Sequence, residues 1–108
     1  MLMKEVFTAM LIDKCGRPGI SFQELVRRIK ACEKTLKLNL WPNESDVYYV
    51  VIYLRDNGHI LWDKKKKIIQ PLPTLREFID GNRKIIAVLA NEQLIQFENF
   101  INSMKEKK

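Results

Sequence analysis

The 108-residue chain contains few of the residues from which metal sites, disulfide frameworks and catalytic centres are usually built. It has two cysteines, Cys15 and Cys32, which lack the number and spacing of a disulfide framework or a zinc site. Its single histidine, His59, has no second histidine or neighbouring cysteine with which to form a metal-binding set. We therefore expect no metal and no cofactor. The cysteines are interpreted as a loop thiol and a small core residue, and His59 as the first residue of a strand.

Other absences exclude further classes of protein. The four glycines form no glycine-rich phosphate loop, and no serine or cysteine is paired with a nearby histidine for nucleophilic catalysis. We therefore expect no enzyme activity. No uninterrupted apolar run approaches the roughly 20 residues that a membrane span requires. The first residues lack the layout of a signal or transit peptide, so we expect one cytoplasmic domain without membrane attachment.

Charge is abundant but unevenly distributed. The net charge of +6 permits anionic partners without specifying one. Segment 21–40 has five basic residues against two acidic ones, and segment 58–73 has four lysines against one aspartate. Segment 43–57, which lies between them, has three acidic residues against one arginine. The sequence therefore has two basic segments separated by an acidic one.

The first half of the chain predicts helices over 3–13 and from residue 22 onward, separated by a glycine- and proline-containing break at 15–19. Ser21 and Glu24 have the spacing of a capping box at the start of the second helix. Ile20 and Leu25 are placed to form the hydrophobic staple that often accompanies it. Apolar residues then follow at helical spacing and leave the basic residues toward solvent.

Segment 43–57 is open to two interpretations. Its residues favour strands, and Asn57-Gly58 is a strong hairpin signal. The helical pattern nevertheless fits better, because Val47, Val50, Val51 and Leu54 recur at the spacing of one helix face. Gly58 then stands where a helix commonly ends in a left-handed residue. We expect a helix, and an extended strand paired with 59–63 is the alternative.

After Gly58 the sequence predicts a hairpin with strands 59–63 and 67–71, whose exposed tip carries the four lysines. Thr74 and Glu77 have the spacing of a second capping box, which predicts a helix over 74–90. Gly81-Asn82 is a candidate bend in this helix. Asn91 is expected to cap a last helix over 91–106.

This order of elements (helix, short strand, helix, turn, helix, hairpin) resembles the winged helix-turn-helix family over residues 3–72. The resemblance is carried by "GISFQELVRRI" and "VYYVVIYLRDNGHILW", which are similar to the second helix and to the third helix with its entry into the wing. The segment "LREFIDGNRKIIAVLANEQLIQFENFINSM" looks like the helices through which small MarR-type and PadR-type transcriptional regulators dimerise. "LWPNESDVYYVV" leans toward the PadR type.

The resemblance implies an α+β, mainly helical fold: a winged helix-turn-helix with two C-terminal helices. Residues 1–73 would form the winged helix-turn-helix and residues 74–108 a helical dimerisation extension of the same domain. The implied function is that of a homodimeric regulator of transcription that binds double-stranded DNA, with helix 43–57 in the major groove. Two copies would place their half-sites about one helical turn of DNA apart.

The residues that would perform this function form three groups. The candidate base contacts are Ser45, Tyr48, Tyr49 and Arg55. The candidate phosphate contacts are Lys64, Lys65, Lys66 and Lys67 in the wing, supported by Arg27, Arg28 and Lys34. The expected dimer interface consists of Phe78, Ile85, Leu89, Leu94, Phe97 and Ile101.

The third helix departs from the family pattern, because it offers few natural base readers and because Glu44 and Asp46 at its entrance would repel phosphates. A winged-helix module that binds another protein through Tyr48, Tyr49 and Ile52 is therefore the alternative function. In that case the lysines would only keep an exposed turn soluble. A further alternative is that some of the tyrosines pack under the C-terminal helices or against a second copy.

Overall fold

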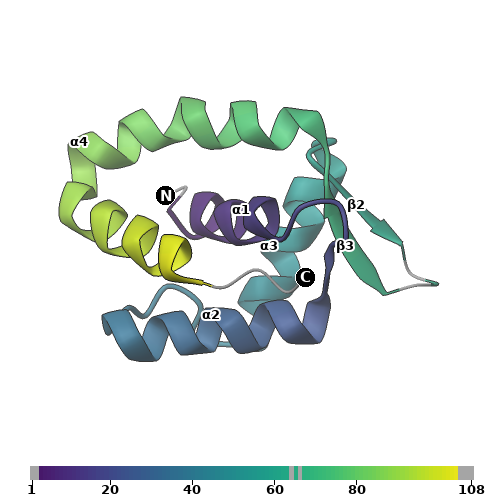
Figure 1. Ribbon diagram of the computed structural model, residues 1–108, viewed down its shortest axis with the longest axis horizontal. Coiled ribbons are helices and arrows are strands. Elements are labelled where there is room, and N and C mark those ends of the chain that lie inside the picture. Colours follow the sequence, from purple (N-terminus) through teal and green to yellow (C-terminus); the bar gives the residue numbers. More distant parts are fainter. Residues whose placement is uncertain (1–2, 64, 66, 105–108) are drawn as a thin grey trace.

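The computed structural model describes residues 3–63, 65 and 67–104 as an α+β fold that is mostly helical (Figure 1). Within these residues there are four helices and a small three-stranded antiparallel sheet, which lies at one end of the helices. In chain order the elements are α1 (Met3–Cys15), β1 (Ile20–Ser21), α2 (Phe22–Leu36), α3 (Glu44–Asp56), β2 (Ile60–Asp63), β3 (Ile68–Pro71) and α4 (Pro73–Ser103). The expected order of helix, short strand, helix, helix and hairpin is confirmed.

Helix α2 begins as the capping box predicts. The Ser21 hydroxyl oxygen accepts a hydrogen bond of 3.1 Å from the backbone N–H of Glu24, which is one of the donors left unpaired at a helix start. Ile20 and Leu25 are both buried, as the hydrophobic staple requires. The helix ends at Lys37, whose left-handed backbone (φ 56°) lets its N–H reach the carbonyl of Glu33.

Segment 43–57 is helical, which decides between the two interpretations of the sequence. Val47, Val50, Val51 and Leu54 are all buried on the inner face of α3. The helix ends in the hydrogen-bond pattern of a Schellman motif: the N–H of His59 reaches the carbonyl of Leu54 at 2.9 Å, and that of Gly58 reaches Arg55 at 3.0 Å. Gly58 adopts φ 75°, so the glycine makes the left-handed residue inexpensive.

The hairpin that follows supplies two of the three strands, and β3 is the central one. Ile69 of β3 is paired with Ile20 of β1 on one side and with Trp62 of β2 on the other. Both pairs of strands are antiparallel. Pro71 is the last residue of β3, which agrees with a proline ending the ladder. The predicted tip residues Lys64 and Lys66 lie outside the described residues.

The predicted start of the C-terminal helix is wrong. Helix α4 begins at Pro73 after the N-cap residue Leu72, so Thr74 and Glu77 do not form a capping box. Proline occupies the first helical position, where its missing N–H costs nothing. The Thr74 hydroxyl instead donates a 2.8 Å hydrogen bond to the carbonyl of Gly58, which ties the start of α4 to the end of α3.

Helix α4 is broken at Ala90 (φ −152°, ψ 53°), and not at the expected bend at Gly81-Asn82. The break lies beside Asn91, where the sequence places the boundary between two helices. The second arm of α4 folds back toward α1 and α2 (Figure 1). Phe97 on this arm stacks on Phe7 of α1, with ring centroids 4.1 Å apart and neither side chain exposed. The two ends of the chain therefore share one core.

Two glycines with positive φ provide a matched test of the fold. A Cβ atom on Gly58 would meet nothing within 4 Å, whereas a Cβ on Gly19 would lie 2.7 Å from the carbonyl oxygen of Ile69. We expect Gly58→Ala to cost about 1–2 kcal/mol through backbone strain alone, and Gly19→Ala to cost about 3 kcal/mol or more because the β1–β3 pairing must also shift. Equal losses in urea unfolding would contradict this account.

A buried polar pair provides a second test. The indole N–H of Trp41 donates a 3.0 Å hydrogen bond to Thr8 Oγ1, and both residues are almost fully buried. Thr8→Val leaves that N–H unpaired, so we expect a loss of about 1–3 kcal/mol in the free energy of unfolding. In a Trp41→Phe background the same substitution should cost less, because no donor remains. Chemical denaturation of the four proteins measures the difference.

Candidate functional site

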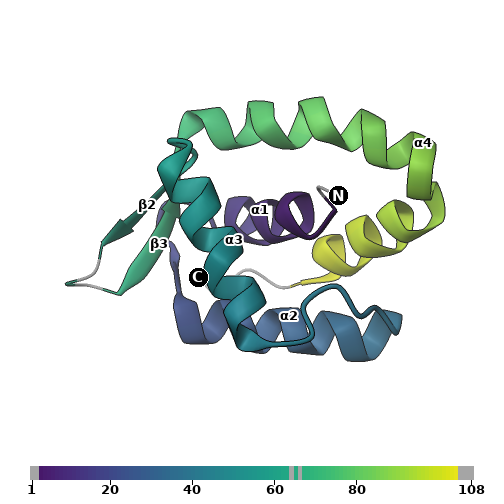
Figure 2. The same ribbon diagram turned by 180° about the vertical axis from the view of Figure 1, so that it is seen from behind.

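Helix α3 lies on the outside of the molecule, between α2 and the β2–β3 hairpin (Figure 2). Its outward face carries the residues that the helical interpretation predicts. Ser45 and Tyr49 are exposed, Tyr49 to 68%, while Tyr48 is 44% exposed and Ile52 is half-buried. Tyr53 lies at the edge of this face, with its ring 6.3 Å from that of Phe78 on α4. Of the tyrosines, it is therefore Tyr53 that packs toward the C-terminal helix.

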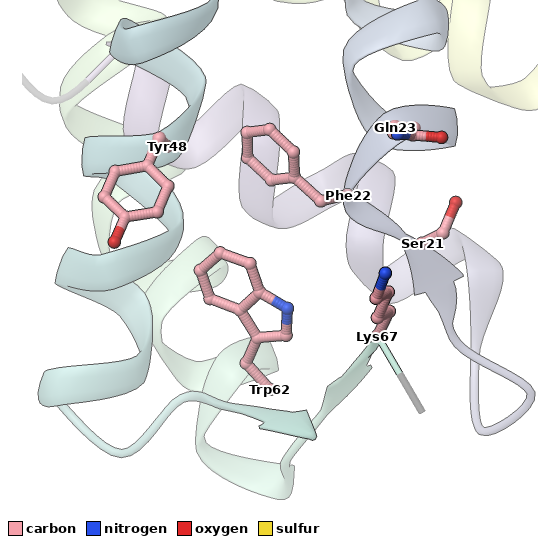
Figure 3. A pocket seen from close by; sticks show the side chains of 6 residues that line it. All are labelled: Ser21, Phe22, Gln23, Tyr48, Trp62 and Lys67. Carbon is pink, nitrogen blue, oxygen red and sulfur yellow. The ribbon is translucent and has the colours of Figure 1, made fainter. Parts of the chain in front are cut away.

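Three aromatic side chains from three elements converge beside this face (Figure 3). Phe22 of α2 stacks on Trp62 of β2 with ring centroids 5.7 Å apart and planes 15° apart. Tyr48 of α3 approaches both rings edge-on, at 6.1 Å from Phe22 and 5.7 Å from Trp62. Because edge-to-face and offset-stacked pairs are favourable, this cluster fixes α3 against α2 and the hairpin.

The aromatic cluster forms one wall of an open pocket of about 400 Å³. The opposite wall is polar and consists of Ser21, Gln23 and Lys67. Figure 3 shows these three side chains on the side of the pocket away from Tyr48. The pocket therefore combines flat apolar surfaces with an ammonium group and an amide.

Lys65 and Lys67 are both exposed at the tip of the hairpin. Lys67 adopts a left-handed backbone conformation (φ 55°), and its side chain lines the aromatic pocket. The backbone N–H of Lys65 donates a 2.9 Å hydrogen bond to Asp63 Oδ1, which shapes the turn. Lys67 therefore lies in the same pocket as Tyr48 of α3, whereas Lys65 lies at the hairpin tip.

The basic residues of α2 divide between two faces. Arg27 and Lys34 are exposed together with Lys30, and they lie with Gln23 on one face of the helix because their spacing is three or four residues. Arg28 is turned the other way: its guanidinium donates a hydrogen bond to Cys15 Sγ at 3.3 Å and pairs with Glu24. Arg28 therefore joins α2 to the end of α1 and does not contribute to the outward basic face.

Neither cysteine has the properties of a nucleophile. Burial raises the pKa of the Cys15 thiol, and the charge of Arg28 offsets only part of that effect. Burial, followed by the charge of Glu33, raises the pKa of Cys32 to about 12. Cys32 is a buried core residue, as expected, whereas Cys15 is the last residue of α1 and not a loop residue.

Arg55 and the acidic residues of α3 already have partners. The Arg55 guanidinium forms an ion pair with the neighbouring Asp56 at 3.2 Å. Asp46 accepts a 2.9 Å hydrogen bond from the N–H of Asn43 and lies 3.9 Å from the Lys4 ammonium. Glu44 is exposed. The negative charge at the helix entrance is thus partly neutralised by α1.

The six residues expected at a dimer interface lie in different environments. Leu94, Phe97 and Ile101 are buried in the core of a single chain, and Phe78 packs against His59 with ring centroids 4.8 Å apart. Ile85 and Leu89 are exposed, on a face that also includes Val88 at 84% exposure. Ile95 is a further exposed apolar residue beyond the break at Ala90.

The sequence does not assign Phe22, Gln23 or Trp62 to a site. Phe22 fits the helical repeat of α2, which is also the pattern of a core residue. The available signal was the alternation of β2: Ile60 is buried and Leu61 exposed, so Trp62 lies on the inner face and near the tip. Gln23 and Lys30 share the helical face of Arg27 and Lys34.

Among residues 3–63, 65 and 67–104, no three histidine, cysteine, aspartate or glutamate side chains are grouped as a metal ion would require. In the same part of the chain, no helix has the length and apolar character needed to cross a membrane. Comparison of the chain with known protein families, with curated proteins and with solved structures finds no match.

Proposed function

We propose that the protein is a winged helix-turn-helix protein that binds double-stranded DNA, as a homodimeric regulator of transcription. The observation that carries this proposal is the position of α3, whose exposed face lies between two sources of positive charge. Figure 2 shows α2 on one side of α3 and the β2–β3 hairpin on the other. Arg27, Lys30 and Lys34 are exposed on α2, and Lys65 and Lys67 are exposed at the hairpin tip. A helix flanked in this way can enter the major groove while the lysines contact the phosphates on either side.

The outward residues of α3 supply the base contacts in this proposal. Ser45 and the hydroxyl groups of Tyr48 and Tyr49 can donate to or accept from base edges, and the tyrosine rings can contact thymine methyl groups. Arg55 can join them if it exchanges Asp56 for a guanine, since a bidentate contact to guanine is the commonest specific one. Arg28 acts only as a support for α2, because its guanidinium is directed to Cys15.

The acidic entrance of α3 is compatible with this arrangement. Lys4 lies close to Asp46, so one of the two carboxylates that face the phosphates is partly compensated. The contribution of such an exposed pair to stability is small, but its effect on the local potential is what matters for an approaching phosphate. Glu44 remains as a negative charge that repels phosphates and so lowers the affinity for DNA.

The exposed apolar face of α4 is proposed to receive a second copy of the chain. Ile85, Val88 and Leu89 lie three and four residues apart and are more than half exposed, at 53%, 84% and 67%. A second copy can pack its own Ile85, Val88 and Leu89 against this face, since a two-fold interface uses the same surface of both copies.

The alternative function is a winged-helix module that binds another protein through Tyr48, Tyr49 and Ile52. The observation in its favour is that two of these side chains are largely exposed although they are aromatic. Tyrosine is enriched at protein interfaces because it combines a large apolar ring with a hydroxyl group.

A salt series with a random DNA duplex tests DNA binding. We expect the logarithm of the affinity to fall linearly with the logarithm of the salt concentration, and Lys65→Ala and Lys67→Ala each to reduce the slope by about 1.8, which is about 0.9 for each copy in the dimer. Lys84→Ala, which removes an exposed lysine of α4 outside both basic groups, should leave the slope unchanged. Absence of binding at low salt would favour the protein-binding alternative.

Light scattering tests the dimer. We expect a solution mass of twice the 12.8 kDa of one chain. Val88→Lys should convert the dimer to a monomer, because it places a charge at the centre of the apolar face without touching the core. Gln93→Lys, which adds the same charge at an exposed position outside that face, is the matched control. A monomeric parent protein would contradict this assignment.

A further inference from the structure

We propose that the pocket between Phe22, Trp62 and Lys67 binds an unpaired base of a DNA strand and that the outward face of α2 holds the phosphates that follow it. The inference rests on the proposed function and extends it: the preferred target would be duplex DNA that carries a single-stranded segment.

The pocket presents ring faces, whereas a duplex presents base edges. In B-form DNA the faces of the bases are stacked on one another, and only their edges are accessible in the grooves. Phe22 and Trp62 form an apolar wall with ring planes only 15° apart, Tyr48 meets them edge-on, and the space beside the three rings has a volume of about 400 Å³. Such a wall has little to contact on a paired base, but an unpaired base can stack on it.

The polar wall suits the rest of a nucleotide. Lys67 brings an ammonium group into the pocket lining, where it can neutralise a phosphate. Gln23 brings a side-chain amide, which can both donate to and accept from the edge of a base. The Ser21 hydroxyl already accepts the N–H of Glu24 and retains its own hydrogen for a further acceptor. A base with its phosphate thus matches both walls.

The positive charge on α2 beside the pocket favours a nucleic-acid strand as the ligand over a free nucleotide or an apolar peptide. Gln23 lies both in the pocket and on the outward face of α2, and Arg27, Lys30 and Lys34 extend that face along the helix. From Gln23 to Lys34 the helix rises roughly 16 Å. At the 3.4 Å spacing of a stacked strand, this distance accommodates about five nucleotides. Positive residues in line with an aromatic pocket are the arrangement that binds single strands.

Three DNA targets built on one duplex test the inference. The first is blunt, the second carries an overhang of five thymidines, and the third carries an overhang of five abasic sites, which retains the phosphates but lacks the bases. We expect the thymidine overhang to raise the affinity about 5- to 100-fold over the blunt duplex, and the abasic overhang to give only part of this gain.

Substitutions locate the effect in the pocket. Trp62→Leu should abolish the difference between the thymidine and abasic overhangs, and Trp62→Phe should largely restore it because a ring is again present. Leu61→Ala is the matched control: Leu61 is the exposed neighbour of Trp62 in β2 and lies outside the pocket, so the preference should be retained. Thermal unfolding of each variant verifies that the chain is folded under the assay conditions.

The outcomes distinguish the two proposals. Equal binding of the blunt and thymidine-overhang duplexes overturns the pocket inference and leaves duplex binding intact. Equal binding of the thymidine and abasic overhangs overturns it as well, because phosphates alone would then account for the gain. Binding of the overhang target without any binding of the blunt duplex supports the pocket and overturns the proposed function. Failure of all three targets to bind at low salt overturns both.

Discussion

The left-handed turn at Gly58 is the constraint on which the arrangement of the site depends. It ends α3, directs the chain into β2 and leaves its own carbonyl free to accept the hydroxyl of Thr74, so that α4 starts from the same point. The N–H of Leu72 also reaches the carbonyl of His59 at 3.0 Å, which closes the hairpin beside the turn. Three elements therefore take their direction from one residue, and the angle between α3 and the hairpin is set there.

That angle determines what α3 can do. Because β2 turns back from the end of α3, Trp62 lies against Tyr48, although the two residues are fourteen positions apart in the sequence. The aromatic contacts among Phe22, Tyr48 and Trp62 then hold α2, α3 and the hairpin as one surface. The cluster thereby fixes the position of α2, which carries basic residues, relative to the lysine-bearing hairpin.

Local patterns predicted the elements well, and tertiary contacts decided what the patterns left open. The capping box at Ser21 and the apolar repeat from Val47 to Leu54 were readable because each depends on residues close in sequence. The start of α4 was misplaced because Thr74 bonds to Gly58, sixteen residues away, and no local pattern reveals such a partner. The prediction over 43–57 succeeded against strand propensity because burial on one face outweighs the preference of single residues.

The candidate site was only partly readable for the same reason. The lysines and tyrosines were evident from composition, whereas the role of Arg28 depended on the position of Cys15 and that of Phe22 on Trp62. Leu94, Phe97 and Ile101 form an apolar stripe that a sequence cannot assign to a core or to an interface. The bend at Ala90 decides the question, since it turns these residues onto α1 of the same chain.

The bend at Ala90 also has a consequence for how the chain acquires its structure. Phe7 stacks on a residue that lies ninety positions later in the sequence, so the inner side of α1 stays without its final cover until the second arm of α4 has been synthesised. Contacts of such long sequence separation slow folding, because a large loop must close before they form. The inner side of α1 therefore gains its full cover only when the second arm of α4 packs against it.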